Sequence, residues 1–129
     1  MSKSTSLTLC AVLIAFSSGS ALAEGDAAKG QDVFKQCAQC HMIGPGATTL
    51  IGPQLNGIIG RKAASVTYPM YSDSMKTFGN FGVVWTEENL DRWITNPKAV
   101  LPDSYMAMFP GVPDAKDRAN LIAYLKTFK

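Results

Sequence analysis

The sequence predicts an all-α fold in which short helices are joined by long loops. Three stretches place apolar residues at helical spacing, near residues 26–36, 86–96 and 114–128. After residue 23 there is no run of β-branched residues that would supply a central strand. The segment 42–85 is instead rich in Gly, Pro, Ser and Thr, which favours loops.

The first predicted helix spans residues 26–36. Asp26 is a suitable N-cap, and Val33 and Phe34 give the helix an apolar side. In the long segment that follows, only a short helical turn near residues 72–76 is expected.

The other two predicted helices carry clear end signals. Thr86 caps the helix over 86–96, two glutamates occupy its positive first turn, and Pro97 ends it. Asp114 caps the last helix, 114–128. Their apolar stripes are Leu90, Trp93 and Ile94 in the former, and Leu121, Tyr124, Leu125 and Phe128 in the latter.

Residues 1–23 form a predicted secretory signal, cleaved to leave one domain over 24–129. Lys3 supplies the positive n-region, residues 7–16 the apolar run, and Ala-Leu-Ala at 21–23 the cleavage site. The apolar run is too short to span a bilayer, so no stable membrane anchor is expected. Cys10 raises a lipoprotein interpretation, which the bulky residue before it disfavours.

The charge balance excludes a nucleic-acid binder. Lys3 is the only charged side chain in residues 1–23, so cleavage lowers the formal charge from +2 to +1, and no basic run occurs. Export by such a signal predicts the periplasm, an oxidising compartment. We expect a soluble monomer there.

The segment Cys37-Ala38-Gln39-Cys40-His41 carries the chemistry. A thioredoxin-like redox pair would need a βαβ context, and structural zinc would need further Cys or His ligands, which the single histidine cannot supply. C-x-x-C-H is the signature of covalent haem attachment. Each thiol adds across one haem vinyl group, and the next residue, His41, lies under the iron as an axial ligand. We therefore predict one covalent haem c, whose apolar macrocycle gives the long loops a core to pack on.

The sequence contains no second histidine, so we expect a methionine to be the sixth iron ligand. The candidates are Met70, Met75, Met106 and Met108. The Pro-bounded loop "PDSYMAMFPG" is well placed to cross the second haem face, although periodicity alone does not separate Met106 from Met108.

Residues 25–129 resemble the class I c-type cytochromes, a family that includes mitochondrial cytochrome c and bacterial periplasmic relatives. The segments "CAQCH", "GPQLNGIIGRK", "YSDS", "VVW", "NPK" and "LIAYLK" recur in order. The resemblance implies a small haem-centred fold, with crossing N- and C-terminal helices, a third main helix and long loops around the haem.

The family also implies roles for single residues. The ring N–H of His41 would donate a hydrogen bond to the carbonyl of Pro53. Met106 would be the sixth ligand, from its interval to Pro97. Residues expected to contact the haem propionates are Arg61, Tyr71, Trp85 and Ser104. Departures include three extra residues between Tyr71 and Trp85, one extra in "MAMFPG", and Met75, Trp93 and Tyr105 in place of the usual residues.

The resemblance implies a one-electron carrier rather than an enzyme. Its expected partners are redox proteins: a membrane quinol-oxidising complex, an oxidase, a reaction centre or a periplasmic dehydrogenase. The alternatives are a haem peroxidase or small-gas sensor, which needs a labile sixth position, and a thiol–disulfide oxidoreductase.

Overall fold

A computed structural model describes residues 22–129, so nearly all of the predicted signal segment lies outside the described part of the chain. The elements are helical, and the only β-type pairing within 22–129 is an isolated bridge between Lys62 and Val84. In chain order they are α1 (Ala27–Phe34), α2 (Asp73–Asn80), α3 (Glu87–Thr95), α4 (Pro97–Val100), the 3-10 helix η1 (Tyr105–Met108) and α5 (Ala115–Leu125). No helix among the described residues is long and apolar enough to cross a membrane.

The three predicted main helices are confirmed, together with their caps. The side chain of Asp26 accepts hydrogen bonds from the first backbone N–H groups of α1, Thr86 does so for α3, and Asp114 for α5. The α5 helix ends at Leu125, earlier than expected, and the chain continues in turns.

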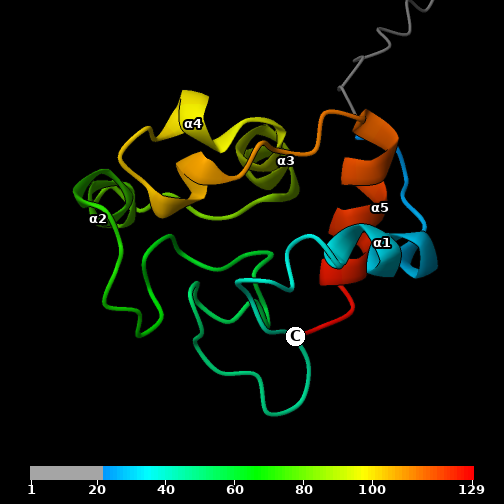
Figure 1. Ribbon diagram of the computed structural model, residues 1–129, viewed down its shortest axis with the longest axis horizontal. Helices are drawn as coiled ribbons and strands as arrows, with labels where there is room; N and C mark the ends of the chain where they lie inside the picture. Colours follow the sequence, from blue (N-terminus) through cyan, green and yellow to red (C-terminus); the bar gives the residue numbers. More distant parts are fainter. Residues whose placement is uncertain (1–21) are drawn as a thin grey trace, which may run out of the picture.

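The terminal helices α1 and α5 cross on one side of the molecule (Figure 1). Their backbones touch at Gly30, where an added Cβ would overlap the carbonyl group of Asn120 and lie 2.7 Å from Cβ of Tyr124. The rings of Phe34 and Tyr124 pack beside this point, with centroids 5.4 Å apart. Glycine therefore permits the close approach that the crossing requires.

Two short elements were not expected from the sequence. Pro97 ends α3, as predicted, but it also begins α4, whose cap is the side chain of Asn96. Proline suits the first helical position because its missing N–H has no intrahelical partner there. Likewise, Ser104 caps η1 by accepting the N–H of Met106 at 3.2 Å.

The loops between α1 and α2 begin beside the α1–α5 crossing and lie below α2 and α3 in Figure 1. They are tied to the segment before α3 by backbone hydrogen bonds: Trp85 N–H donates to the carbonyl of Arg61 at 2.8 Å, and Ala63 N–H donates to that of Val83 at 2.8 Å. Trp85 is buried and packs against Trp93, with ring centroids 5.7 Å apart. This pairing fixes Arg61 next to the aromatic core.

Candidate cofactor site

The end of α1 positions the cysteine pair. The chain leaves the helix in further tight turns, in which Cys37 N–H donates to the carbonyl of Phe34 at 2.8 Å and His41 N–H donates to that of Cys37 at 3.0 Å. Cys37 and Cys40 are both free thiols and half-buried, and Cys37 packs against the apolar core. The helix thus delivers two thiols and an imidazole to one place.

The ring of His41 lies against the backbone of Gly52 and Pro53. Its Nδ1 lies 2.7 Å from the carbonyl oxygen of Pro53, the contact that the family resemblance implies. We assign the proton to Nδ1, because only an N–H can donate to this carbonyl. A Cβ added at Gly52 would lie 2.7 Å from Nδ1, so only glycine fits beside the ring.

The surroundings of His41 favour the neutral form of its imidazole. Burial lowers its pKa, the Pro53 hydrogen bond partly opposes that effect, and the charge of Arg61 lowers the pKa further. Nε2 makes no hydrogen bond within residues 22–129. A neutral imidazole whose Nδ1–H donates to a carbonyl is the form in which histidine binds iron.

The thiols do not resemble a redox-active dithiol or a bare metal site. Burial raises the pKa of Cys37 to about 11, and the charge of Cys40 contributes to that rise. Redox-active cysteines instead have lowered pKa values, because the thiolate is the nucleophile. The described residues also contain no group of three or more His, Cys, Asp or Glu side chains that could hold a metal ion.

The four candidate methionines differ in their surroundings. Met75 is buried within α2, whereas the side chains of Met70 and Met108 are 40% and 83% exposed. Met106 is half-buried in η1 and packs against the apolar core. Burial therefore favours Met106 over Met108, the alternative that periodicity left open.

Three of the four predicted propionate contacts belong to one neighbourhood. Arg61 donates to the carbonyl oxygens of Gln54 and Asn56, at 2.8 and 3.2 Å, and its backbone pairs with that of Trp85. Burial raises the pKa of Tyr71, and the nearby Arg61 charge opposes that rise. Ser104 lies apart from them in chain order, at the start of η1 beside Met106.

Sequence reasoning missed the role of Asn56. Its Oδ1 accepts the N–H of Gly44 at 2.7 Å, and its Nδ2 donates to the carbonyl of Gly44 at 2.8 Å. These reciprocal bonds close the loop that contains Pro53, while the backbone carbonyl of Asn56 receives Arg61. An asparagine just before a glycine is a turn signal that could have indicated this.

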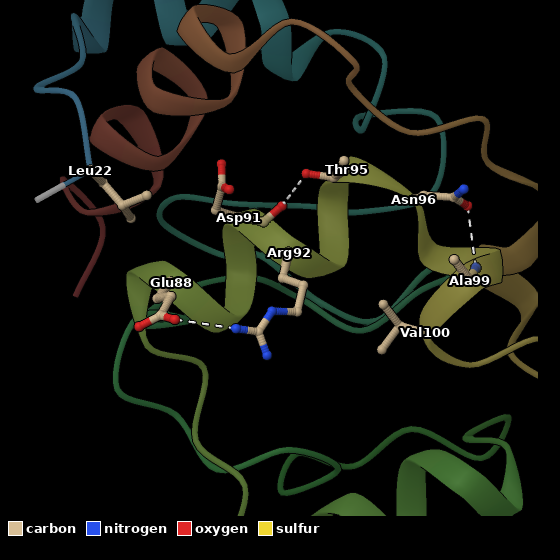
Figure 2. Close-up of a pocket in the computed structure, with 8 residues that line it drawn as sticks. All are labelled: Leu22, Glu88, Asp91, Arg92, Thr95, Asn96, Ala99 and Val100. Atoms are coloured by element: carbon tan, nitrogen blue, oxygen red, sulfur yellow. Dashed lines mark hydrogen bonds and ion pairs between the residues drawn. The ribbon is translucent and has the colours of Figure 1, made fainter. Parts of the chain in front are cut away.

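The hollow along α3 does not present a second site (Figure 2). Its polar side chains are already paired with each other or with the backbone: Arg92 with Glu88 at 3.2 Å, Thr95 with the carbonyl of Asp91 at 2.7 Å. Asn96 is engaged in capping α4. A ligand entering this hollow would find no convergent unpaired group among them.

The chemistry of the donor set fits haem. Two half-buried thiols precede a neutral imidazole whose Nδ1 donates to a carbonyl and whose Nε2 makes no hydrogen bond in the described part of the chain, and other loops and short helices carry half-buried apolar side chains. The latter include Leu55, Ile59, Tyr71, Phe78, Met106 and Phe109. An apolar macrocycle would cover such side chains, and its propionates would match the charge of Arg61.

Comparison with known proteins identifies the family. The Cytochrome c family profile matches residues 27–129. Cytochrome c2 of Rhodomicrobium vannielii is 47% identical to this chain over 110 residues, and the match covers 85% of each chain. Cytochrome c-554 of Methylosinus trichosporium is 42% identical over 128 residues, and the match covers 98% of this chain and 94% of that one. The structure of cytochrome c2 from Rhodospirillum centenum matches with a TM-score of 0.70 and 37% identity, covering 81% of this chain and 98% of that one.

The chain therefore belongs to the cytochrome c family. It carries one covalently attached haem c with its iron, and it is an electron carrier rather than an enzyme. The predicted all-α, haem-centred fold with crossing terminal helices is confirmed.

Proposed function

We propose that this protein is a periplasmic one-electron carrier with His41 and Met106 as the axial ligands of its haem iron. Cys37 and Cys40 form the thioether bonds. The observation that carries the proposal is the fixed, neutral imidazole of His41, held by the Pro53 carbonyl immediately after the cysteine pair. When bound, the haem supplies a ferric–ferrous couple that accepts or donates one electron.

The protein's own contribution is a rigid ligand environment. The hydrogen bond from His41 to Pro53 orients the imidazole and makes it a better electron-pair donor, and the absence of a side chain at Gly52 lets the backbone approach the ring closely. A methionine sulfur opposite histidine raises the reduction potential relative to a purely nitrogenous site. A closed pair of ligands admits no substrate, which suits electron transfer.

Arg61, Tyr71, Trp85 and Ser104 are the proposed propionate contacts. Arg61 is half-buried, and burial lowers the pKa of its guanidinium group. A cation in such a position stabilises a nearby carboxylate, because the surrounding protein screens the attraction less than water does. The backbone pairing of Arg61 with Trp85 would hold two of these contacts at one edge of the haem.

The proposed location and partners rest on the sequence. Residues 1–23 have the pattern of a cleaved export signal, so residues 24–129 would work in the periplasm. We propose that it carries electrons between redox proteins such as a membrane quinol-oxidising complex, an oxidase, a reaction centre or a periplasmic dehydrogenase. Residues 24–129 would act as a monomer.

Intact mass and optical spectra test the attachment and the ligand set. The mature chain should retain one haem after acid–acetone extraction, and Cys37→Ser and Cys40→Ser should each impair covalent attachment. The ferric spectrum should contain the weak thioether-to-iron charge-transfer band at its red end. A mass equal to the bare polypeptide would exclude thioether attachment, and a high-spin spectrum would indicate an open sixth position.

A further inference from the structure

The backbone hydrogen bonds within the loop that presents Met106 are local. Ser104 N–H donates to the carbonyl of Leu101 at 3.1 Å, Ala107 N–H to that of Ser104 at 2.9 Å, and Phe109 N–H to that of Met106 at 3.0 Å. At both ends the chain is well anchored, because Leu101 and Val112 are buried. Between these ends, Met106 and Phe109 are only partly buried against the core, so a hydrogen bond to another segment would further fix the position of the loop.

Asp103 makes that contact. Its Oδ2 accepts the backbone N–H of Ser74, in the first turn of α2, at 3.2 Å. Among the described residues, Asp103 is the only member of 102–109 that is hydrogen-bonded to a segment distant in sequence. The same N–H lowers the pKa of the Asp103 carboxyl group, and the hydroxyls of Ser74 and Ser72 contribute.

The α2 helix is a firm base for this bond. A Cβ at Gly79 would lie 2.5 Å from the carbonyl oxygen of Ala63, so the helix lies directly on the segment that follows Arg61. Met75 is buried on the same helix, and Val83 N–H donates to the carbonyl of Phe78 at 3.0 Å just beyond it. The first turn of α2 cannot shift far without disturbing these contacts.

Charge also favours the bond, because Asp103 faces a helix N-terminus. Unpaired backbone N–H groups and the helix dipole make this end of α2 attractive to a carboxylate. The neighbouring charges of α2 compensate each other, since Lys76 Nζ lies 3.2 Å from Asp73 Oδ1. The carboxylate of Asp103 therefore acts through its hydrogen bonds more than through a distant ion pair.

We propose that Asp103 is a positioning residue that fastens the Met106 loop to α2 and thereby keeps the methionine sulfur on the iron. The inference rests on the proposed ligation by Met106 and adds a residue that is three positions away from the ligand. It makes α2 part of the support for the sixth ligand. Loss of the bond should let the loop move outward more often while both its ends stay anchored.

Imidazole binding to the ferric protein tests this inference. Imidazole can reach the iron only while the sulfur is dissociated, so the rate of loss of the charge-transfer band reports loop opening. Asp103→Ala should raise this rate about three- to tenfold, because the lost hydrogen bond is solvent-exposed and is therefore weaker than a buried bond to a charged group. Asp103→Asn keeps an acceptor oxygen and should restore a rate close to that of the unchanged protein.

Asp73→Ala is the matched control. It removes an acidic side chain from the same helix end, but this residue is 98% exposed and belongs to α2 rather than to the Met106 loop. It should change helix stability slightly and leave imidazole entry unchanged. Amide hydrogen exchange over residues 104–109 should rise in Asp103→Ala only.

Equal imidazole rates in Asp103→Ala and Asp73→Ala, with the band present in the unchanged protein, would overturn the inference and leave the proposed function intact. If the unchanged protein itself lacked the charge-transfer band, both the proposed ligation by Met106 and this inference would be wrong. The two failures are therefore distinguished by the spectrum of the unchanged protein.

Discussion

Nε of Arg118 lies 2.7 Å from Oδ1 of Asp91, and this ion pair joins α5 to α3. The two side chains are only 12% and 23% exposed. Arg118 also donates from Nη1 to the carbonyl oxygens of Val112 and Pro113, at 3.0 and 2.8 Å. One guanidinium group thus fixes both helices and the chain that leaves the Met106 loop.

Removal of the Asp91 carboxylate should destabilise the fold, because the Arg118 guanidinium group would lose its charged partner. Asp91→Ala should lower the free energy of unfolding by about 2–4 kcal/mol, since a mostly buried charge loses its partner. Chemical denaturation of the holoprotein measures the change. Arg92→Ala is the control: it breaks an exposed pair with Glu88 and should cost no more than about 0.5 kcal/mol. Equal losses in both variants would contradict a special role for the Arg118 pair.

The helix crossing gives a second prediction. Gly30→Ala should destabilise the protein by about 1–3 kcal/mol, because the new methyl group would overlap the backbone of Asn120 and push α1 from α5. This loss should outweigh the gain in helix propensity, about 1 kcal/mol, that alanine brings. Lys29→Ala, at the exposed neighbouring position, should leave the denaturation midpoint nearly unchanged. A midpoint for Gly30→Ala equal to that control would show that the helices can separate freely.

A third prediction concerns association with an acidic redox partner. Lys98→Glu should slow electron transfer at low ionic strength, and the difference should fade as salt is added. Lys35→Glu should act in the same direction but more weakly, because Lys35 Nζ already lies 2.7 Å from Asp32 Oδ1. Stopped-flow oxidation of the reduced protein over a salt series measures both. If the rates were independent of salt and unchanged in both variants, these lysines would not belong to the surface that binds the partner.

The sequence predicted the parts of the fold that depend on local signals. Asp26, Thr86 and Asp114 cap their helices, because a short polar side chain before an apolar stripe is itself the physical cause of a helix start. It missed α4, because Pro97 can both end one helix and begin the next, and the choice depends on the Asn96 cap.

The part of the site around the cysteine pair could be predicted, because haem attachment requires a fixed spacing of Cys and His. The contacts between loops could not. The C-x-x-C-H motif itself contains the residues predicted to bind the haem. In the structure, His41 contacts the carbonyl of Pro53, as the family resemblance implied. The reciprocal bonds of Asn56 and the bond from Ser74 to Asp103 join segments far apart in the sequence. No periodic pattern in the sequence predicts such pairs, because they depend on how the loops fold against each other.

The fourth prediction separates the two methionines of η1. Met106→Leu should leave the haem attached, because attachment depends on Cys37, Cys40 and the opposite haem face. It should abolish the thioether-to-iron charge-transfer band and lower the reduction potential, since sulfur is replaced by a weaker or nitrogenous donor. It should also admit small ligands such as imidazole to the iron. Optical titration of the ferric and ferrous forms measures all three effects.

Met108→Leu is the matched control, because it makes the same substitution two positions away in the same 3-10 helix. Its side chain is 83% exposed, so the band and the potential should both be retained. Residues Tyr105 and Met108 are three apart, which places them on one side of a 3-10 helix, whereas Met106 points elsewhere and packs against the core. If Met108→Leu abolished the band and Met106→Leu kept it, the loop would have to rotate on haem binding, and the one-residue insertion would precede the ligand.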